Sequence, residues 1–114
     1  MPYLRLETSV VIPEEKATNI LKELSAAVAQ VTNKPEARCQ VSLTGGVRML
    51  MAGSVEPTAH VEVKGILFPV DHAKPLSERV CALLQRELGI PGARVYMTFA
   101  SFEGAMWGVD GTTR

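Results

Sequence analysis

The sequence predicts an α+β fold in which two βαβ halves form one four-stranded mixed sheet with both helices on one face. Three observations support this fold class. Strand-like alternation and helical periodicity follow one another over residues 2–43, and the same order returns over residues 58–99. A short motif recurs at corresponding points of the two halves. The length of 114 residues suits one domain, so we expect residues 1–114 to form a single domain.

The first half is expected to begin with a strand. Residues 2–10 alternate, and Leu4, Leu6, Thr8 and Val10 share one face. Pro13, Glu14 and Glu15 then favour a helix start, because proline is tolerated in the first turn and carboxylates suit the positive end of the helix dipole. Apolar residues at helical spacing predict a helix over 13–31. A strand over 39–43 follows, Gly45 and Gly46 favour a hairpin bend, and residues 48–51 are expected to form the returning strand.

The second half repeats this order, with a strand predicted over 58–68, a helix over 73–88 and a strand over 94–99. The motifs Pro35-Glu36-Ala37-Arg38 and Pro91-Gly92-Ala93-Arg94 lie 56 positions apart, each after a helix and before a strand. The same shift aligns apolar helix positions: Ile20 with Leu76, Leu24 with Val80, Ala27 with Leu83 and Val28 with Leu84. Because each crossover should be right-handed, both helices are expected on the same face of the sheet.

The other face of this predicted sheet has no helix to cover it. We expect that face to carry apolar side chains, and a closed ring of identical subunits is the usual way to cover such a surface. Five methionines and few aromatic residues in a chain without net charge also favour self-association. The apolar run over 105–109 is long enough for a short strand that would extend a neighbour's sheet. A homo-oligomer is therefore expected.

Composition argues against several classes of partner. Basic and acidic residues number 12 each, and no aromatic residues interleave with the basic ones, so nucleic acid is not an expected partner. No apolar stretch reaches the length of a membrane span and no secretory signal is recognisable, so we expect a cytoplasmic protein that does not bind membranes. Cys39 and Cys81 lie far apart, without the CxxC spacing of metal-binding or redox-active pairs. His60 and His72 have no other metal-ligating residues at a suitable spacing, so no metal site is expected.

Pro2 is the residue with the most distinctive chemistry, because it follows the initiator methionine and begins the first predicted strand. If Met1 is removed, the chain starts with a secondary amine whose lone pair can take a proton from carbon. Burial and a nearby cation both disfavour the protonated amine and lower its pKa toward neutrality. With Met1 retained, the nitrogen of Pro2 is an amide and has no basic lone pair. Proline at this position is common in unrelated proteins, so its meaning depends on the rest of the chain.

The rest of the chain supplies that context. Met1-Pro2 before a strand, the turn Lys34-Pro35, the linker Gly53-Ser54-Val55-Glu56-Pro57, the segment Arg94-Val95-Tyr96 and the tail Trp107-Gly108-x-x-Gly111-x-Thr113 occur in that order. Together they resemble the macrophage migration inhibitory factor family of the tautomerase superfamily, over essentially the whole chain.

This resemblance implies a cofactor-independent keto-enol tautomerase, an isomerase acting on phenylpyruvate-like α-keto acids. It also implies a homotrimer with its sites between subunits. The family contains signalling proteins as well, and non-classical secretion is known in it. The alternative function is therefore a cytokine-like or partner-binding protein with weak or vestigial tautomerase activity.

The resemblance also implies roles for individual residues. Pro2 would be the general base, and Lys34 would bind the substrate carboxylate together with the backbone amide of Ile66 in the segment that contains Gly65. Tyr96 would come from a neighbouring subunit, Thr98 would contact the phenyl or hydroxyl end of the substrate, and Trp107 would line the pocket.

The residues taken alone leave other interpretations open. Lys34 also fits an exposed lysine at a helix end, and Gly65 fits a bulge, a bend or a close backbone approach. Tyr96 also fits a core position, and Trp107 an interface anchor. Thr98 stands where the animal cytokines of the family have asparagine, so substrate preference is expected to differ. The CxxC of those cytokines is absent, since Thr58-Ala59-His60-Val61 replaces it, so no thiol redox activity of that kind is expected.

Overall fold

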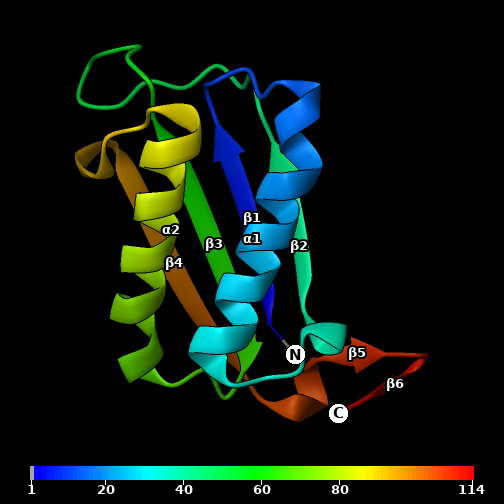
Figure 1. Cartoon of the computed structure of the whole chain (residues 1–114). Coiled ribbons are helices and arrows are strands. Elements are labelled where there is room, and N and C mark those ends of the chain that lie inside the picture. The colour runs from blue at the N-terminus through cyan, green and yellow to red at the C-terminus, as the bar shows by residue number, and fades with distance from the viewer. Residues whose placement is uncertain (1) are drawn as a thin grey trace.

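The computed structural model describes residues 2–114 as a four-stranded sheet covered on one face by two helices (Figure 1). The strands are β1 (Tyr3–Thr8), β2 (Gln40–Thr44), β3 (Ala59–Ile66) and β4 (Val95–Phe102), and the helices are α1 (Glu14–Thr32) and α2 (Ala73–Leu88). The sheet order is β2-β1-β3-β4, in which the central pair β1 and β3 is antiparallel and both outer pairs are parallel. The predicted fold class is confirmed. None of the described helices is both long and apolar enough to cross a membrane.

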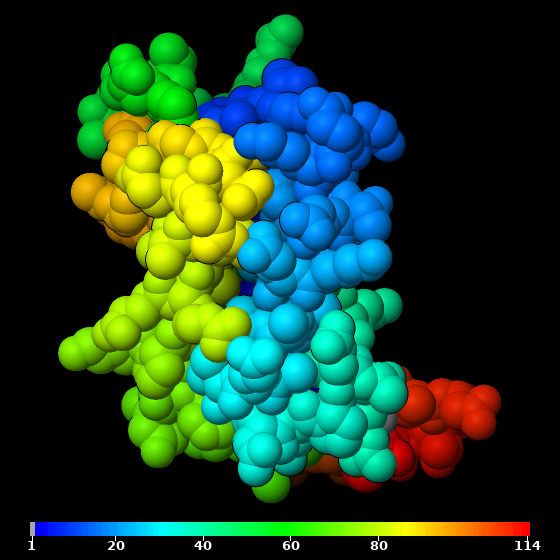
Figure 2. All heavy atoms as spheres, in the orientation of Figure 1, coloured from blue at the N-terminus to red at the C-terminus, as the bar shows by residue number. Residues whose placement is uncertain are grey.

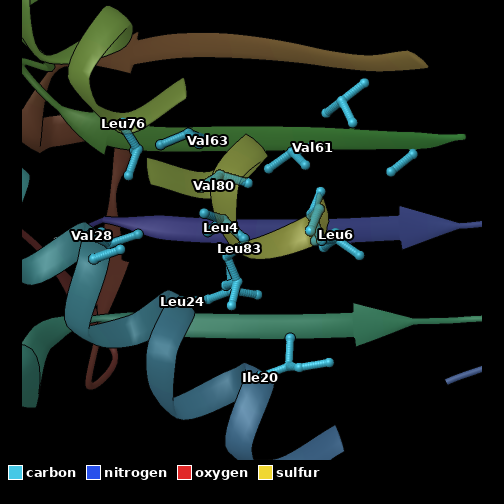
Figure 3. Close-up of a cluster of buried hydrophobic side chains, with 14 of the residues drawn as sticks. Leu4, Leu6, Ile20, Leu24, Val28, Val61, Val63, Leu76, Val80 and Leu83 are labelled. Carbon is cyan, nitrogen blue, oxygen red and sulfur yellow. The ribbon is translucent and has the colours of Figure 1, made fainter. Parts of the chain in front are cut away.

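The core lies between the sheet and the two helices, as the repeat predicted. The four aligned pairs of helix residues are at most 5% exposed: Ile20 with Leu76, Leu24 with Val80, Ala27 with Leu83 and Val28 with Leu84. Figure 3 shows the helix side chains that it labels, Ile20, Leu24, Val28, Leu76, Val80 and Leu83, beside Leu4 and Leu6 of β1 and Val61 and Val63 of β3. Each of the leucine, isoleucine and valine side chains contributes about 1.5–3 kcal/mol to folding when it leaves water. The repeat extends to the helix ends, because Asn33 and Gly89, also 56 positions apart, both adopt the left-handed conformation that ends a helix.

The returning strand predicted over 48–51 is wrong. After β2 the chain does not reverse at Gly45 and Gly46, because the amides of Gly46 and Val47 donate to Val10 O and Thr8 O and keep the chain beside the end of β1. The reversal comes later. Met51 and Ser54 exchange backbone hydrogen bonds of 3.1 and 2.9 Å around Ala52 and Gly53, whose φ angles of 51° and 70° fit a tight two-residue turn.

The other element boundaries differ at strand ends. β3 stops at Ile66 because Leu67 has a φ of 48°, and β4 runs to Phe102, past the predicted end at residue 99. Only part of the predicted tail strand forms: Gly104–Met106 is a 3-10 turn, and β5 (Gly108–Val109) pairs with β6 (Thr112–Thr113). Figures 1 and 2 show this hairpin projecting from the body of the molecule beside the end of the sheet.

The uncovered face of the sheet is mostly polar, which corrects the expectation of an apolar face. Arg5 lies between two carboxylates there, with Nη2 at 3.6 Å from Glu7 and Nη1 at 4.0 Å from Glu62. The hydroxyl of Tyr3 is 2.8 Å from Ser42 Oγ on the same face. Strand alternation explains why this face is polar. Most apolar residues of β1 and β3 stand at alternate positions and point toward the helices, so the positions between them, which are mostly polar, point the other way.

Candidate active site

A cavity of about 120 Å³ lies at the end of the sheet where β1 begins and β3 ends. Four residues singled out in the sequence line it: Pro2, Lys34, Gly65 and Ile66. The remaining lining residues are Thr32, Leu67, Phe68, Pro69 and His72. The cavity therefore draws on three separate segments: the start of β1, the end of α1, and the chain from β3 to α2.

Pro2 is buried and fixed by the sheet. Its carbonyl accepts a hydrogen bond of 3.1 Å from the amide of Gln40, the first residue of β2. β1 lies between β2 and β3, so the nitrogen of Pro2 stands at the start of a central strand. Residues near a chain end often fray, whereas Pro2 is held in place by this bond.

Lys34 reaches the cavity because of the way α1 ends. Asn33 takes φ 54° and ψ 41°, and the amide of Lys34 donates to Ala29 O at 3.1 Å, which turns the chain away from the helix axis. No carboxylate among the described residues pairs with Lys34, and no acidic residue lines the cavity. The same cavity meets the start of α2, whose first turn carries no acidic residue. A cation and a positive helix end together favour a bound anion.

Gly65 allows a close approach and does not form a bulge. The pairing of β3 with β4 continues through Gly65 and Ile66 without interruption. A Cβ on Gly65 would lie 3.2 Å from Cδ2 of Phe68, so the bare backbone leaves room for that ring at the cavity wall.

The amide of Ile66 faces the side from which β1 starts. The amide of Ser9 donates to Thr58 O at 3.1 Å, so Ser9 and Thr58 are a hydrogen-bonded pair. In an antiparallel ladder such pairs recur at every second residue, and the last one within β1 is Tyr3 opposite Lys64. Two residues further along β3, Ile66 is the next residue whose amide points toward the β1 side, and it lies beyond the first residue of β1. The amide of Leu67 faces the other way and donates to Phe102 O at 2.8 Å, as strand alternation requires.

The structure does not bring Tyr96 and Thr98 to this cavity. Both are exposed on the uncovered face of the sheet, where Tyr96 pairs in register with His60 and Thr98 with Glu62. His60 is six residues before Ile66 along β3, a separation of roughly 20 Å at about 3.3 Å per residue. Within one chain, Tyr96 is therefore out of reach of Pro2.

Trp107 lies at the same end of the sheet as the cavity but does not line it. Its ring packs edge-on against Phe102, with ring centroids 5.9 Å apart, and Phe102 pairs in register with Ile66. Thus Trp107 lies beside the cavity wall.

Sequence reasoning missed five residues of the cavity wall, of which Phe68 and His72 carry rings. The available signal for these two rings was their place in the chain: both follow the strand that ends beside the start of β1, so they had to lie near Pro2. Within residues 2–114, no three histidine, cysteine or acidic side chains are grouped so that they could hold a metal ion.

Comparison with known proteins agrees with this architecture. The family model for macrophage migration inhibitory factor matches residues 1–114. The chain is 32% identical to a macrophage migration inhibitory factor homolog of Brugia malayi, over 99% of this chain and 98% of that one. It is also 32% identical to D-dopachrome decarboxylase of Bos taurus, over 98% and 96% of the two chains.

Solved structures give the same result. The crystal structure of a macrophage migration inhibitory factor homologue from Prochlorococcus marinus has a TM-score of 0.91 and 34% identity, with 97% of each chain covered. A macrophage migration inhibitory factor-like protein from Entamoeba histolytica has a TM-score of 0.92 at 26% identity, over 99% of this chain and 98% of that one. The chain therefore belongs to the macrophage migration inhibitory factor family of the tautomerase superfamily.

Proposed function

We propose that this protein is a cofactor-independent keto-enol tautomerase that acts on phenylpyruvate-like α-keto acids, with Pro2 as the general base once Met1 has been removed. The observation that carries this proposal is the convergence of Pro2, Lys34 and Ile66 on one cavity. These residues come from segments far apart in the sequence, and each offers a group that the reaction needs.

The reaction moves a proton between carbon and oxygen of the substrate. A base that works near neutral pH must take the proton, and a secondary amine beside a cation fits that requirement. Lys34 binds the substrate carboxylate as a point charge. A chain that begins at Pro2 has no residue at the bonding position opposite Ile66, so the amide of Ile66 is available to the same anion.

A homotrimer with shared sites completes this proposal. Small-molecule sites usually have volumes of roughly 300–1,000 Å³, and the 120 Å³ cavity of one chain is enough for only the anionic end of an aromatic keto acid. Tyr96 and Thr98 are exposed and too far from the cavity of their own chain, and in this proposal they serve the cavity of a neighbouring subunit. The projecting β5 and β6 hairpin, beside Trp107, offers the contact between subunits (Figure 1).

The test combines N-terminal analysis with kinetics. Intact mass identifies the fraction of the sample that starts at Pro2, and that fraction should turn over phenylpyruvate. Pro2→Gly keeps a free amine and the fold, measured by circular dichroism, and should lose about a hundredfold or more in kcat. Undiminished turnover by Pro2→Gly would refute the role of Pro2.

Two further outcomes separate the alternatives. A correctly processed protein that neither converts nor binds α-keto acids would favour the signalling or partner-binding function. Sedimentation equilibrium tests the assembly, and a monomer at micromolar concentration would contradict the shared site.

A further inference from the structure

His72 is a side chain of the cavity wall to which neither the sequence pattern nor the proposed mechanism gives a role. It is the last residue of a 3-10 turn, Val70–His72, and directly precedes α2. Its main-chain amide donates to Pro69 O at 3.1 Å, which fixes the backbone. The side chain makes no capping hydrogen bond to the helix that follows.

The ring of His72 is held in place, yet one of its nitrogens has no partner. The ring lies edge-on to Phe68, with centroids 6.0 Å apart and planes at 89°. Nδ1 is buried and has no hydrogen-bond partner among the described residues. A buried polar atom without a partner is unfavourable by about 1–3 kcal/mol, so such atoms in native proteins usually have a reason. His72 is among the residues that line the cavity, so a molecule bound there would lie next to this ring.

The other polar groups of the cavity show which partner fits. The hydroxyl of Thr32 is already used, because it donates to Val28 O at 2.6 Å, and the amide of Leu67 donates to Phe102 O. Among the described residues, the remaining groups of the cavity that can donate are Lys34, the Ile66 amide and His72, and no acidic side chain lines the cavity to accept from them. Three donors without an internal acceptor suit a planar anion with two oxygens.

We infer that His72 is a substrate-binding residue that donates a ring N–H hydrogen bond to the carboxylate of the α-keto acid, beside Lys34 and the amide of Ile66. This inference rests on the proposed function, since it assigns one more contact to the same substrate. The tautomer with its proton on Nδ1 supplies the donor. Phe68 sets the ring plane, and Gly65 leaves the space that Phe68 needs.

Steady-state kinetics of two substitutions test the contact. His72→Leu removes the donor but keeps a side chain of similar bulk, and it should raise KM for phenylpyruvate about tenfold with kcat within about twofold, because a carboxylate is bound equally before and during proton transfer. His72→Asn returns a donor near the position of Nδ1 and should restore KM to within about threefold of the wild type. Val70→Ala, in the same turn and 91% exposed, is the control and should change neither constant. A normal KM in His72→Leu overturns the inference, as does a fall in kcat alone.

A second measurement does not depend on turnover. The chain has two histidines, and His60 lies on the uncovered face of the sheet. With ¹⁵N-labelled histidine, phenylpyruvate should shift the ring nitrogens of His72 and leave those of His60 in place. If the His72 signals shift but the protein has no tautomerase activity, the proposed function is refuted while the contact between His72 and the carboxylate is supported. Normal turnover with unmoved His72 signals would keep the function and refute the contact.

Discussion

Arg94 offers a test of how the two halves are joined. Its guanidinium donates to four backbone carbonyls of the linker and of the turn before it: Pro57 O at 2.9 Å, Met51 O at 3.2 Å, Ser54 O at 3.1 Å and Glu56 O at 3.0 Å. Each hydrogen bond contributes about 0.5–1.5 kcal/mol net. Because one of the four is exposed and the others are partly buried, we expect Arg94→Ala to lose about 3 kcal/mol in the free energy of unfolding.

A loss of that size should lower Tm by about 10 °C in a chain of this length. The assay is thermal unfolding followed by circular dichroism, at one fixed protein concentration because assembly also raises Tm. The repeat supplies the matched control: Arg38 is equivalent to Arg94 but forms no side-chain hydrogen bond to another residue within 2–114, so Arg38→Ala should change Tm by less than about 2 °C. An equal fall in Tm in the two variants would refute the view that the hydrogen bonds of Arg94 to the four carbonyls, and not its charge alone, stabilise the linker.

Three further outcomes follow, two from the cavity and one from the free cysteines. Lys34→Ala should raise KM for phenylpyruvate at least tenfold while Tm changes by less than about 3 °C, measured by steady-state kinetics and thermal unfolding, and an unchanged KM would exclude Lys34 from substrate binding. Gly65→Ala brings a Cβ to 3.2 Å from the Phe68 ring, so kcat/KM should fall several-fold in a folded protein, whereas full activity would show that this wall adjusts freely. Burial raises the pKa of the Cys39 and Cys81 thiols, so alkylation by iodoacetamide at pH 7.5 should be slower than for a free thiol and should accelerate above pH 9; rapid reaction at pH 7.5 would contradict this.

Most of the fold could be predicted because the two halves of the sequence show the same order of strand, helix and strand. Helical periodicity located α1 and α2 to within a residue at either end, and the 56-residue shift aligned side chains that are all buried. The strand predicted over 48–51 does not form, because Gly45 and Gly46 do not make the expected turn and the chain does not reverse there. Gly45 is needed for packing, since a Cβ there would lie 2.8 Å from Ile12, and the turn is made by Ala52 and Gly53 instead.

The uncovered face shows a second limit of pattern reading. Alternation indicates that a strand has two faces, but whether the second face is apolar depends on which residues the sheet brings side by side. Arg5, Glu7 and Glu62 are scattered charges in the sequence and form an ion-pair cluster only when β1 and β3 pair.

The sequence by itself determined the two βαβ halves, the burial of their helix stripes and the place of Pro2 at the head of a strand, because periodicity and chain order are local properties. Only the tertiary structure decided which side chains meet at that strand end. It brought Lys34, Ile66 and the unanticipated His72 to Pro2, and it kept Tyr96 about 20 Å away along the sheet. The physical reason is that a site formed from three segments depends on strand register and on where each helix ends, and single-residue preferences do not set either one.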